Sequence, residues 1–368
     1  MRSSIVSISN VILLNILFFY YKSILKKKII FFYHPKISLI KIHDYYIKDL
    51  FSKIKENYKV IYGLQPSNNF KSNFVNIFYI NQGYLRYVAN VDIFISLNIV
   101  DIFTKNSKKI YIHHSVYDTP LASKNKDNKL RKRLSKYDYI LLSSKDAKNI
   151  FDKIFSNYHS IKPIILIIGY LKLDYLKKNN NKLKAQNKIV IAPTGIRSFP
   201  DLSMQKHLLK LIKELLKLRK YLIVYRPHPS DFYNKAVLKI NHLLKLNKSF
   251  ILDRSSNYDY HYKTSKLLIT DLSGTSYTYA LLTNNPVIFF SKNENYISNK
   301  TYYKKLNFFK NRIKIGEILK NENNVLHTLK KIEKKRNIYK RNISDIRRNI
   351  KNRGTTKNKL LKFIYTLS

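Results

Sequence analysis

Short apolar runs alternate with longer amphipathic stretches along most of the chain. Residues 164–168 and 287–290 are continuous apolar runs, which are typical of strands buried on both faces. Between such runs, apolar residues recur at helical spacing, for example over residues 44–56 and 145–155. This alternation predicts an α/β fold built on parallel sheets.

Two series of these elements flank a polar stretch, residues 177–187, which is expected to be a linker or an exposed loop. The first series predicts strands at 29–33, 60–63, 76–80, 93–97, 109–113, 139–143 and 163–168. The second predicts a helix over 202–219 and strands at 189–192, 222–225, 250–252, 267–270 and 287–290. Two such series indicate two Rossmann-like domains that face one another across a cleft.

The amino end carries a largely apolar run, residues 5–21, followed by Lys22, Lys26, Lys27 and Lys28. About seventeen apolar residues is the lower limit for crossing a bilayer. The run predicts either a membrane anchor or interfacial helix, or a helix packed on the first domain. A signal peptide is disfavoured because a small-residue cleavage site is lacking. If the helix crosses the bilayer, the lysines would keep the rest of the chain in the cytoplasm.

The carboxyl end, from residue 317 onward, is helical in pattern and very basic. It is expected to form solvated helices or to contact an anionic membrane surface. The expected division of the chain is therefore residues 1–28, 29–176, 188–316 and 317–368.

Composition supports a globular protein, because 45% of the 368 residues are hydrophobic and 14% are aromatic. The formal net charge of +48 raises the possibility of nucleic-acid binding. However, the lysines are spread over nearly every segment, and Asn, Ile, Tyr and Phe are abundant too, which favours a compositional bias. No nucleic-acid partner is expected, whereas attraction to anionic lipid or to a polyanionic substrate fits the charge. The absence of cysteine excludes disulfides and thiolate chemistry.

Polar clusters follow four of the expected strands. The first contains His113 and His114, and a neutral imidazole at a strand end can take a proton from a hydroxyl group. Strand alternation sends only one of the two side chains inward. A structural histidine is the alternative, and a metal site is not expected because no further ligands lie at suitable spacing.

The second and third clusters are 226–229, which reads Arg-Pro-His-Pro, and 193–197, which reads Pro-Thr-Gly-Ile-Arg. Prolines fix the backbone around His228, and both Arg226 and His228 have groups that can donate to a phosphate. Gly195 would let a ligand approach the backbone, and Arg197 could pair with a phosphate. A plain turn with an exposed arginine is the alternative for the third cluster.

The fourth cluster, residues 271–276, is a polar turn between an expected strand and an expected helix. A helix that begins with Gly274, Thr275 and Ser276 offers backbone N–H groups to an anion. Open α/β sheets bind ligands at such turns, so a phosphate-bearing ligand is the first hypothesis. In the alternative, Ser273 or Thr275 only caps the helix.

The order and spacing of these segments resemble the CDP-glycerol glycerophosphotransferase family, whose members polymerise teichoic-acid-type and related surface polymers. The resemblance covers roughly residues 108–291. It rests on the segments Ala192-Pro193-Thr194, Arg226-Pro227-His228-Pro229, residues 268–274, 280–282 and 286–290, and on Gly169 to Asp174, which is similar to the family's Gly-x-Pro-Arg-x-Asp.

The resemblance implies a GT-B fold in which residues 29–176 bind the acceptor and residues 188–316 bind the CDP-activated donor. The family's proposed base matches His114, because Thr119-Pro120-Leu121 follows it as Thr-Pro-Leu does in the family. The family's His-Pro histidine matches His228, and its Asp-x-Ser-Ser turn matches Asp271, Ser273 and Gly274. The chain departs from the pattern at His113, Ser115, Gly274 and Thr278, and these departures bear on the identity of the donor.

The expected protein is a membrane-associated transferase that moves glycerol phosphate from CDP-glycerol to a hydroxyl of a growing surface polymer or lipid-linked acceptor. His114 and His228 are the expected catalytic residues, and no metal or cofactor is expected. Arg226, Ser273, Gly274, Thr275 and Arg197 are expected to bind the donor phosphates, with His113 and Asp271 as further candidates. The alternatives are a capsule or lipopolysaccharide glycosyltransferase that uses a sugar nucleotide or a CMP-sugar, and a basic nucleic-acid-binding protein.

Overall fold

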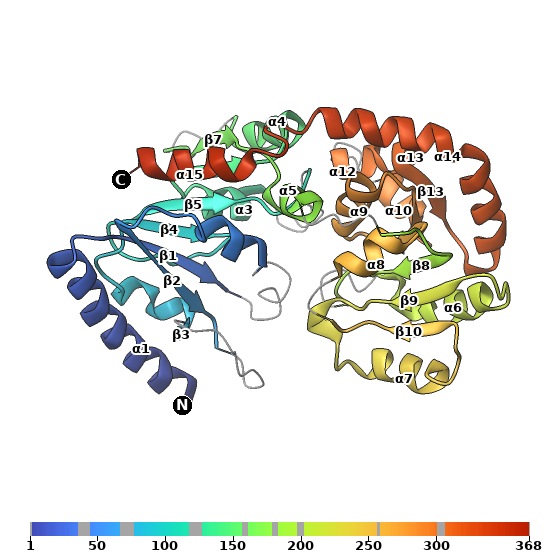
Figure 1. Cartoon of the computed structure of the whole chain (residues 1–368), viewed down its shortest axis with the longest axis horizontal. Coiled ribbons are helices and arrows are strands. Elements are labelled where there is room, and N and C mark those ends of the chain that lie inside the picture. Colours follow the sequence, from blue (N-terminus) through green and yellow to red (C-terminus); the bar gives the residue numbers. More distant parts are fainter. Residues whose placement is uncertain are drawn as a thin grey trace. The chain divides into compact units, whose positions relative to one another are not determined.

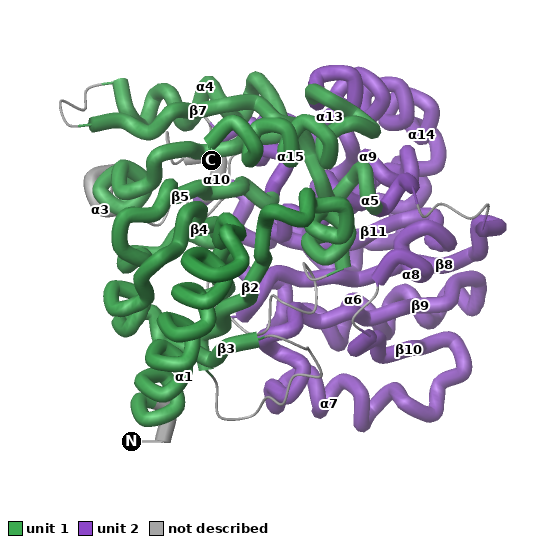
Figure 2. The backbone as a smooth tube through the Cα atoms, turned by 60° about the vertical axis from the view of Figure 1, so that its left-hand side comes forward, with its two compact units in different colours: residues 1–114, 125–175, 351–368 green, residues 115–124, 176–350 purple. Residues whose placement is uncertain are grey.

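The computed structural model describes residues 2–35, 45–66, 77–117, 127–156, 161–178, 183–196, 202–255, 258–299 and 306–367. The chain divides into two compact units, shown in green and purple in Figure 2. Unit 1 contains Met1–His114, Asn125–Tyr175 and Lys351–Ser368, and unit 2 contains Ser115–Lys124 and Leu176–Ile350.

Unit 1 is built on a seven-stranded sheet in the order β3-β2-β1-β4-β5-β6-β7, in which all neighbouring strands are parallel (Figure 1). The carboxyl ends of its strands therefore share one edge of the sheet. The strands are β1 (Lys28–His34), β2 (Tyr58–Leu64), β3 (Ile77–Tyr79), β4 (Ile93–Ser96), β5 (Lys108–Ile112), β6 (Tyr139–Leu142) and β7 (Ile164–Ile167).

Helices pack on this sheet through apolar stripes. In α4 (Lys145–Ile154), Ser144 caps the first turn by accepting from the N–H of Ala147 at 3.2 Å, and Phe151 is buried. In α15 (Thr356–Thr366), Leu360 and Ile364 enter the core formed by the strands. The other helical segments are α1 (Arg2–Phe19), η1 (Tyr20–Ile24), residues 45–51, η2 (Gln82–Tyr87), α3 (Asp127–Leu134) and α5 (Leu171–Lys178).

Unit 2 is built on a six-stranded parallel sheet in the order β10-β9-β8-β11-β12-β13. From β8 the chain continues to one side of the sheet, and from β11 it continues to the other. The loops after β8 and β11 therefore meet at a topological switch point, where open α/β sheets bind ligands. The strands are β8 (Lys188–Ile191), β9 (Leu222–Tyr225), β10 (Phe250–Leu252), β11 (Leu267–Thr270), β12 (Val287–Phe290) and β13 (Gly316–Leu319).

The helices of unit 2 connect these strands and cover the sheet. The longest is α14 (Val325–Arg348), which buries Leu329, Ile332 and Ile343. The others are η4 (Met204–His207), α6 (Leu208–Leu216), η5 (Pro229–Asp231), α7 (Lys235–Leu244), α8 (Asp259–Thr264), α9 (Thr275–Thr283), α10 (Glu294–Asn299), α12 (Asn307–Lys310), α13 (Arg312–Ile315) and η6 (Glu322–Asn324).

All the expected strands are present, and three expectations about the remaining segments need correction. The helix expected over 202–219 is a 3-10 turn followed by an α-helix that ends at Leu216, and the helix expected over 44–56 ends at residue 51 in the described part. Residues 317–319 belong to strand β13 instead of a helix.

Strand β13 was missed because it begins with a glycine, which is not typical of a strand, and a close backbone contact requires this glycine. A Cβ on Gly316 would lie 1.7 Å from the carbonyl oxygen of Val287, so only glycine lets this strand pair with β12. Glu317 gives the strand a polar residue, and its carboxylate bonds to Lys331 of α14 at 2.6 Å. The carboxyl region is also shared between the units, because residues up to Ile350 belong to unit 2 and Lys351–Ser368 to unit 1.

Candidate active site

His114 follows β5 at the carboxyl edge of the unit 1 sheet. Its Nδ1 lies 2.8 Å from the carbonyl oxygen of Leu97, which follows β4. A carbonyl oxygen can only accept, so Nδ1 carries the proton, and Nε2 is the basic nitrogen of the neutral ring. Burial lowers the pKa of His114 to about 4; the bond to Leu97 opposes this effect and the charge of Lys172 adds to it. The ring is therefore neutral at neutral pH.

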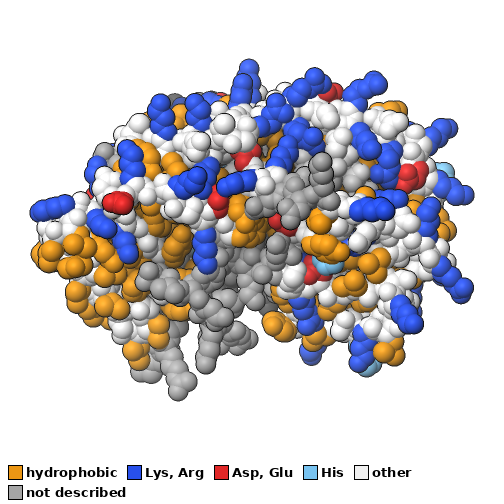
Figure 3. All heavy atoms as spheres, in the orientation of Figure 1, with side chains coloured by type: hydrophobic (Ala, Val, Ile, Leu, Met, Phe, Trp, Pro, Cys, Tyr) orange, Lys and Arg blue, Asp and Glu red, His pale blue; other side chains and the backbone are white. Residues whose placement is uncertain are grey.

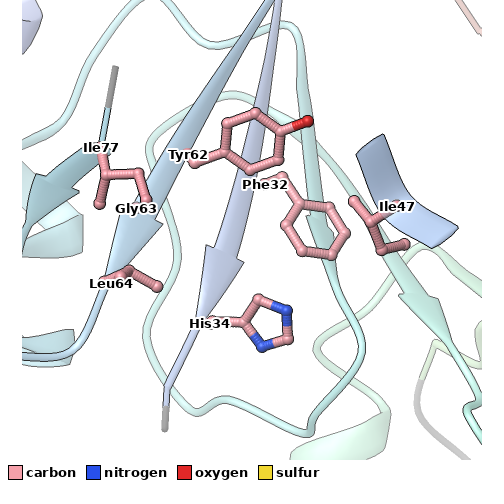
Figure 4. Close-up of a pocket in the computed structure, with 7 residues that line it drawn as sticks. All are labelled: Phe32, His34, Ile47, Tyr62, Gly63, Leu64 and Ile77. Carbon is pink, nitrogen blue, oxygen red and sulfur yellow. The ribbon is translucent and has the colours of Figure 1, made fainter. Parts of the chain in front are cut away.

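A second histidine, His34, ends β1 at the same edge. It is 4% exposed, and burial together with nearby His114 lowers the pKa of His34 to about 3. Figure 4 shows His34 in a mainly apolar recess beside Phe32 and Ile47, which is also lined by Tyr62, Gly63, Leu64 and Ile77. His34 was not among the predicted site residues, although it has the same sequence signal as His113 and His114, a histidine that follows an apolar strand.

The segment from Gly169 to Asp174 supports the region around His114. Gly169 has a φ of 120°, and a Cβ there would lie 2.5 Å from Oγ1 of Thr356, so the position requires glycine. Asp174 accepts a hydrogen bond from the N–H of Thr356 at 3.1 Å. These two residues fasten the segment to the start of α15. Between them, the hydroxyl of Tyr170 donates to the carbonyl of His114 at 3.4 Å.

His113 is built into the core of unit 1. It is 3% exposed, its Nδ1 lies 3.0 Å from the hydroxyl of Tyr111, and its ring packs against Phe151 of α4 with a centroid distance of 5.4 Å. Strand alternation thus gives the adjacent histidines different surroundings, and His113 has those of a structural residue.

Asp271 forms hydrogen bonds that hold the loops together at the switch point of unit 2. It is 1% exposed and directly follows β11. Its Oδ1 accepts from the N–H groups of Thr194 and Leu272, each at 2.7 Å, and its Oδ2 accepts from the N–H of Met204 at 3.0 Å. Burial raises the pKa of Asp271, while these backbone bonds oppose the rise. Asp271 therefore fixes the loop after β8 against the turn after β11.

His228 packs against the same loop. The N–H of Ser230 donates to Nδ1 of His228 at 3.2 Å, and the hydroxyl of Ser230 lies 2.6 Å from the same nitrogen. Because Nδ1 accepts from this N–H, it holds the lone pair, and Nε2 carries the proton of the neutral ring. A Cβ on Gly195 would lie 3.2 Å from Nδ1 of His228, so glycine allows this close approach. Asp231 accepts from the N–H of Ile196 at 2.9 Å and joins the two segments further.

Helix α9 begins beside these groups with the predicted Gly-Thr-Ser sequence. Oγ of Ser273 accepts from the N–H of Thr275 at 3.4 Å, as expected of a residue that stabilises the first turn. Oγ1 of Thr275 lies 2.6 Å from the hydroxyl of Tyr262. A Cβ on Gly274 would lie 3.4 Å from Oγ of Ser115, so Ser115, which also belongs to unit 2, lies against the start of α9.

Arg226 forms a buried ion pair at the ends of β9 and β10. It is 6% exposed, and its Nη1 lies 2.5 Å from Oδ2 of Asp253. Its Nη2 donates to the carbonyl of Ser255 at 2.9 Å, and its guanidinium lies over the ring of Tyr258 at 5.3 Å. Burial raises the pKa of Asp253, but Arg226 and Ser255 outweigh it and hold that pKa below its usual value. Asp253 was missed, although it follows an expected strand directly.

The remaining site predictions concern Arg197 and metal binding. Arg197 lies outside the described residues. Among the residues that are described, no group of three or more His, Asp or Glu side chains could hold a metal ion.

Two parallel-sheet units with polar groups at the carboxyl edges of both sheets form a GT-B fold. Comparison with known protein families identifies the family within this fold class. A sequence model of the CDP-glycerol:poly(glycerophosphate) glycerophosphotransferase family matches residues 17–365. The chain belongs to this family and is a transferase.

Solved structures of other proteins share the fold. The wall teichoic acid polymerase TagF is 20% identical with a TM-score of 0.64, over 99% of this chain and 96% of that chain. A TagF variant with one histidine replaced by asparagine, soaked with CDPG, is 19% identical with a TM-score of 0.66, over 99% and 97% of the chains. MnaA of S. aureus with UDP is 12% identical with a TM-score of 0.61, over 93% and 98%. No curated protein matches the chain.

Proposed function

We propose that this protein transfers glycerol phosphate from CDP-glycerol to a hydroxyl group at the end of a growing bacterial surface polymer of the teichoic-acid type, or of its lipid-linked acceptor. The acceptor oxygen attacks the phosphorus that bears the glycerol. A new O–P bond forms, the bond to the bridging oxygen of the pyrophosphate breaks, and CMP leaves with the electron pair. The proton of the acceptor hydroxyl goes to Nε2 of His114.

The proposal for His114 rests on its tautomer. The carbonyl of Leu97 accepts from Nδ1, so the neutral ring has its lone pair on Nε2. Because the pKa of His114 is low, almost all of the ring is in this form at neutral pH. His34 lies at the same sheet edge, where the acceptor is expected to bind.

On the donor side, His228 and the start of α9 are proposed to hold the pyrophosphate. In the neutral ring Nε2–H of His228 is a donor, and the N-terminus of α9 adds backbone N–H groups and a favourable dipole. Ser273 and Gly274 shape this turn. Arg197 is retained as a proposed phosphate contact.

Arg226 and Thr275 are better assigned to positioning than to direct phosphate contact. The guanidinium of Arg226 is paired with Asp253 and Ser255, and the hydroxyl of Thr275 is paired with Tyr262. Asp271 acts through the loops that it holds. We propose that these three residues keep His228 and α9 in place.

The observation that carries the donor assignment is the switch point, where Asp271 holds the loop that packs on His228 beside the first turn of α9. The test is turnover by the purified protein with CDP-glycerol, CMP-sugars and UDP-sugars, measured as released CMP, CDP or UDP. CMP release from CDP-glycerol alone is expected. Release of CMP from a CMP-sugar or of UDP from a UDP-sugar, with none from CDP-glycerol, would refute the assignment and favour a glycosyltransferase.

Variants of the two site histidines test the roles within the reaction. His114→Asn is expected to abolish turnover and His228→Asn to lower kcat about a hundredfold, while both proteins remain folded. His242→Asn is the matched control, because this histidine is exposed on α7, away from the sheet edge. Wild-type rates in either site variant would overturn the role assigned to that residue.

We further propose that the enzyme works at the cytoplasmic face of the membrane, where a lipid-linked acceptor is available. The N-terminal helix and the excess of basic side chains over the visible face in Figure 3 support this location.

A further inference from the structure

Helix α1 has one face buried on unit 1. Val11, Leu14 and Phe18 are 7%, 0% and 0% exposed, and the ring of Phe18 meets Phe31 of β1 edge-on with centroids 6.0 Å apart. These residues recur at i, i+3 and i+7, which is the spacing of one helix face. Helix α1 is therefore packed as a tertiary element of unit 1.

Polar residues fix this inner face to the backbone of residues 79–89. Oγ of Ser7 accepts from the N–H of Asn81 at 3.0 Å, and Nδ2 of Asn10 donates to the carbonyl of Tyr79 at 2.9 Å. Asn15 bonds twice, through Nδ2 to the carbonyl of residue 87 at 2.9 Å and through Oδ1 to the N–H of residue 89 at 2.8 Å. Three of the polar residues that interrupt the apolar run, Ser7, Asn10 and Asn15, thus attach the helix.

The opposite face of α1 is exposed along its whole length and is apolar except for Ser9. Its apolar side chains are between 43% and 63% exposed, which is unusual for so many large hydrophobic residues in one row. Figure 3, in the orientation of Figure 1, shows hydrophobic side chains gathered over this helix. This outer face consists of Ile5, Val6, Ile8, Ile12, Leu13, Ile16, Phe19 and Tyr20, and it continues to Ile24 and Leu25.

Lysines border the carboxyl end of this face. Lys22 and Lys26 are exposed, and Lys27 and Lys28 are partly exposed. Lys22 bonds to Asp92 at 2.7 Å, which fixes the end of the helix beside the start of β1. An apolar row beside lysines matches an anionic bilayer surface, where the row enters the acyl boundary and the ammonium groups meet lipid phosphates.

We infer that α1 lies in the plane of an anionic membrane, with its outer face in the lipid and its inner face still attached to unit 1, and that it does not cross the bilayer. The segment Ser4–Ile24 is long and apolar enough to span by composition, and 22% of its most apolar window is buried. Spanning would strip Ser7, Asn10 and Asn15 of their backbone partners and move their polar groups into hydrocarbon. It would also uncover Phe18 and the apolar surface beneath it.

The direction of α1 has a consequence for the acceptor, and this step rests on the proposed function. Ser7 and Asn10 bond at the carboxyl end of β3, whereas Lys22 bonds near the start of β1. The amino end of the helix therefore lies toward the sheet edge that carries His34 and His114. A lipid-linked acceptor would approach that edge along the bilayer surface.

The chain contains neither tryptophan nor cysteine, so a single introduced tryptophan reports depth in the membrane without background. Ile5→Trp, Ile12→Trp and Phe19→Trp would be measured separately with phosphatidylglycerol-rich vesicles that carry bromine at defined acyl positions. In-plane binding predicts the same shallow quenching depth at all three positions. Deep quenching at residue 12 with shallow quenching at residues 5 and 19 would show a spanning helix and overturn the inference. Leu246→Trp, at a site 90% exposed in unit 2, is the control and should not be quenched.

A charge variant separates docking from catalysis. Ile12→Asp with Ile16→Asp is expected to reduce vesicle flotation at least tenfold, while CMP release with CDP-glycerol and a soluble acceptor stays unchanged. The matched control is Leu243→Asp with Leu246→Asp on the exposed side of unit 2, which should float normally. Unchanged flotation of the α1 variant, or lipid-free self-association that α1 mutation abolishes, would refute lipid as the occupant. Equal binding to neutral vesicles would refute the requirement for an anionic surface. Loss of CMP release in all proteins, with flotation intact, would refute only the proposed function.

Discussion

Lowering the pH tests the proposed base directly, because burial has moved the pKa of His114 far from that of an exposed histidine. An ordinary histidine titrates at 6.5, whereas the pKa of His114 is about 4. The pH dependence of kcat/KM reports the free enzyme, so its acid limb is expected near pH 4 and not near 6.5. The acid limb of the pH profile of kcat should lie at a higher pH, because the negative charge of the bound donor favours the protonated ring of His114.

The same shift predicts a pH-dependent loss of stability. The unfolded chain binds a proton at pH 6.5, whereas the folded chain binds it only near pH 4. The stabilisation is therefore complete above pH 6.5 and is lost as the pH falls from 6.5 toward 4. At ~1.4 kcal/mol per pH unit, the loss attributable to His114 is about 3 kcal/mol.

The assay is urea unfolding of the wild-type protein and of His114→Asn between pH 4 and pH 8. The asparagine amide can still donate to the carbonyl of Leu97 but does not titrate, so the difference between the two curves isolates His114. The lowered pKa of His34 also destabilises both proteins as the pH falls, so its contribution cancels to first order in the difference between the two curves. Parallel curves, or an acid limb of kcat/KM between pH 6 and pH 7, would refute the buried neutral base.

Three substitutions test other parts of the site and fold. His228→Asn keeps an acceptor for the backbone N–H but removes Nε2–H, and we expect about a hundredfold loss in kcat with an unchanged urea midpoint; a lower midpoint would point to a structural role instead. Arg226→Met leaves the carboxylate of Asp253 buried without its partner and should cost about 3–5 kcal/mol in urea unfolding. Adding Asp253→Leu should restore most of this stability, and failure to do so would contradict the ion-pair explanation. Gly316→Ala places a Cβ on the backbone of Val287 and should lower stability by more than ~3 kcal/mol, so a near-neutral result would refute the close pairing of β12 and β13.

The fold was predictable because buried parallel strands are nearly continuous apolar runs. The run Val287–Phe290, for example, is buried at every position, and its period and length left little choice of structure. Strand β13 was not predictable, because Gly316 and Glu317 interrupt its apolar pattern. Its place in the sheet depends on a backbone contact with Val287 and on the bond to Lys331 of α14, and neither leaves a local signal in the sequence.

The site was only partly predictable, for a related reason. Residue type and position at a strand end proposed His228 and Asp271 and left His113 and His114 as alternatives, between which the family resemblance chose His114. The same reasoning proposed that Arg226 contacts phosphate. Its guanidinium is paired with Asp253, a residue 27 positions away that the chain brings alongside at the end of the next strand. Sequence spacing does not show whether a basic side chain faces a ligand or an internal partner.

The two site histidines make this point most sharply, because they are the same residue type in opposite tautomers. At His114 the partner of Nδ1 is a carbonyl oxygen, which fixes the proton on Nδ1 and leaves Nε2 as a base. At His228, Nδ1 accepts from the backbone N–H of Ser230 and lies 2.6 Å from the hydroxyl of the same residue, which leaves Nε2–H as a donor. One group can accept the proton of an attacking hydroxyl, and the other can stabilise a phosphate oxygen. The carbonyl beside His114 belongs to a residue 17 positions away, so the sequence does not show it, and the proposed division of roles depends on the fold bringing the end of β4 beside the end of β5.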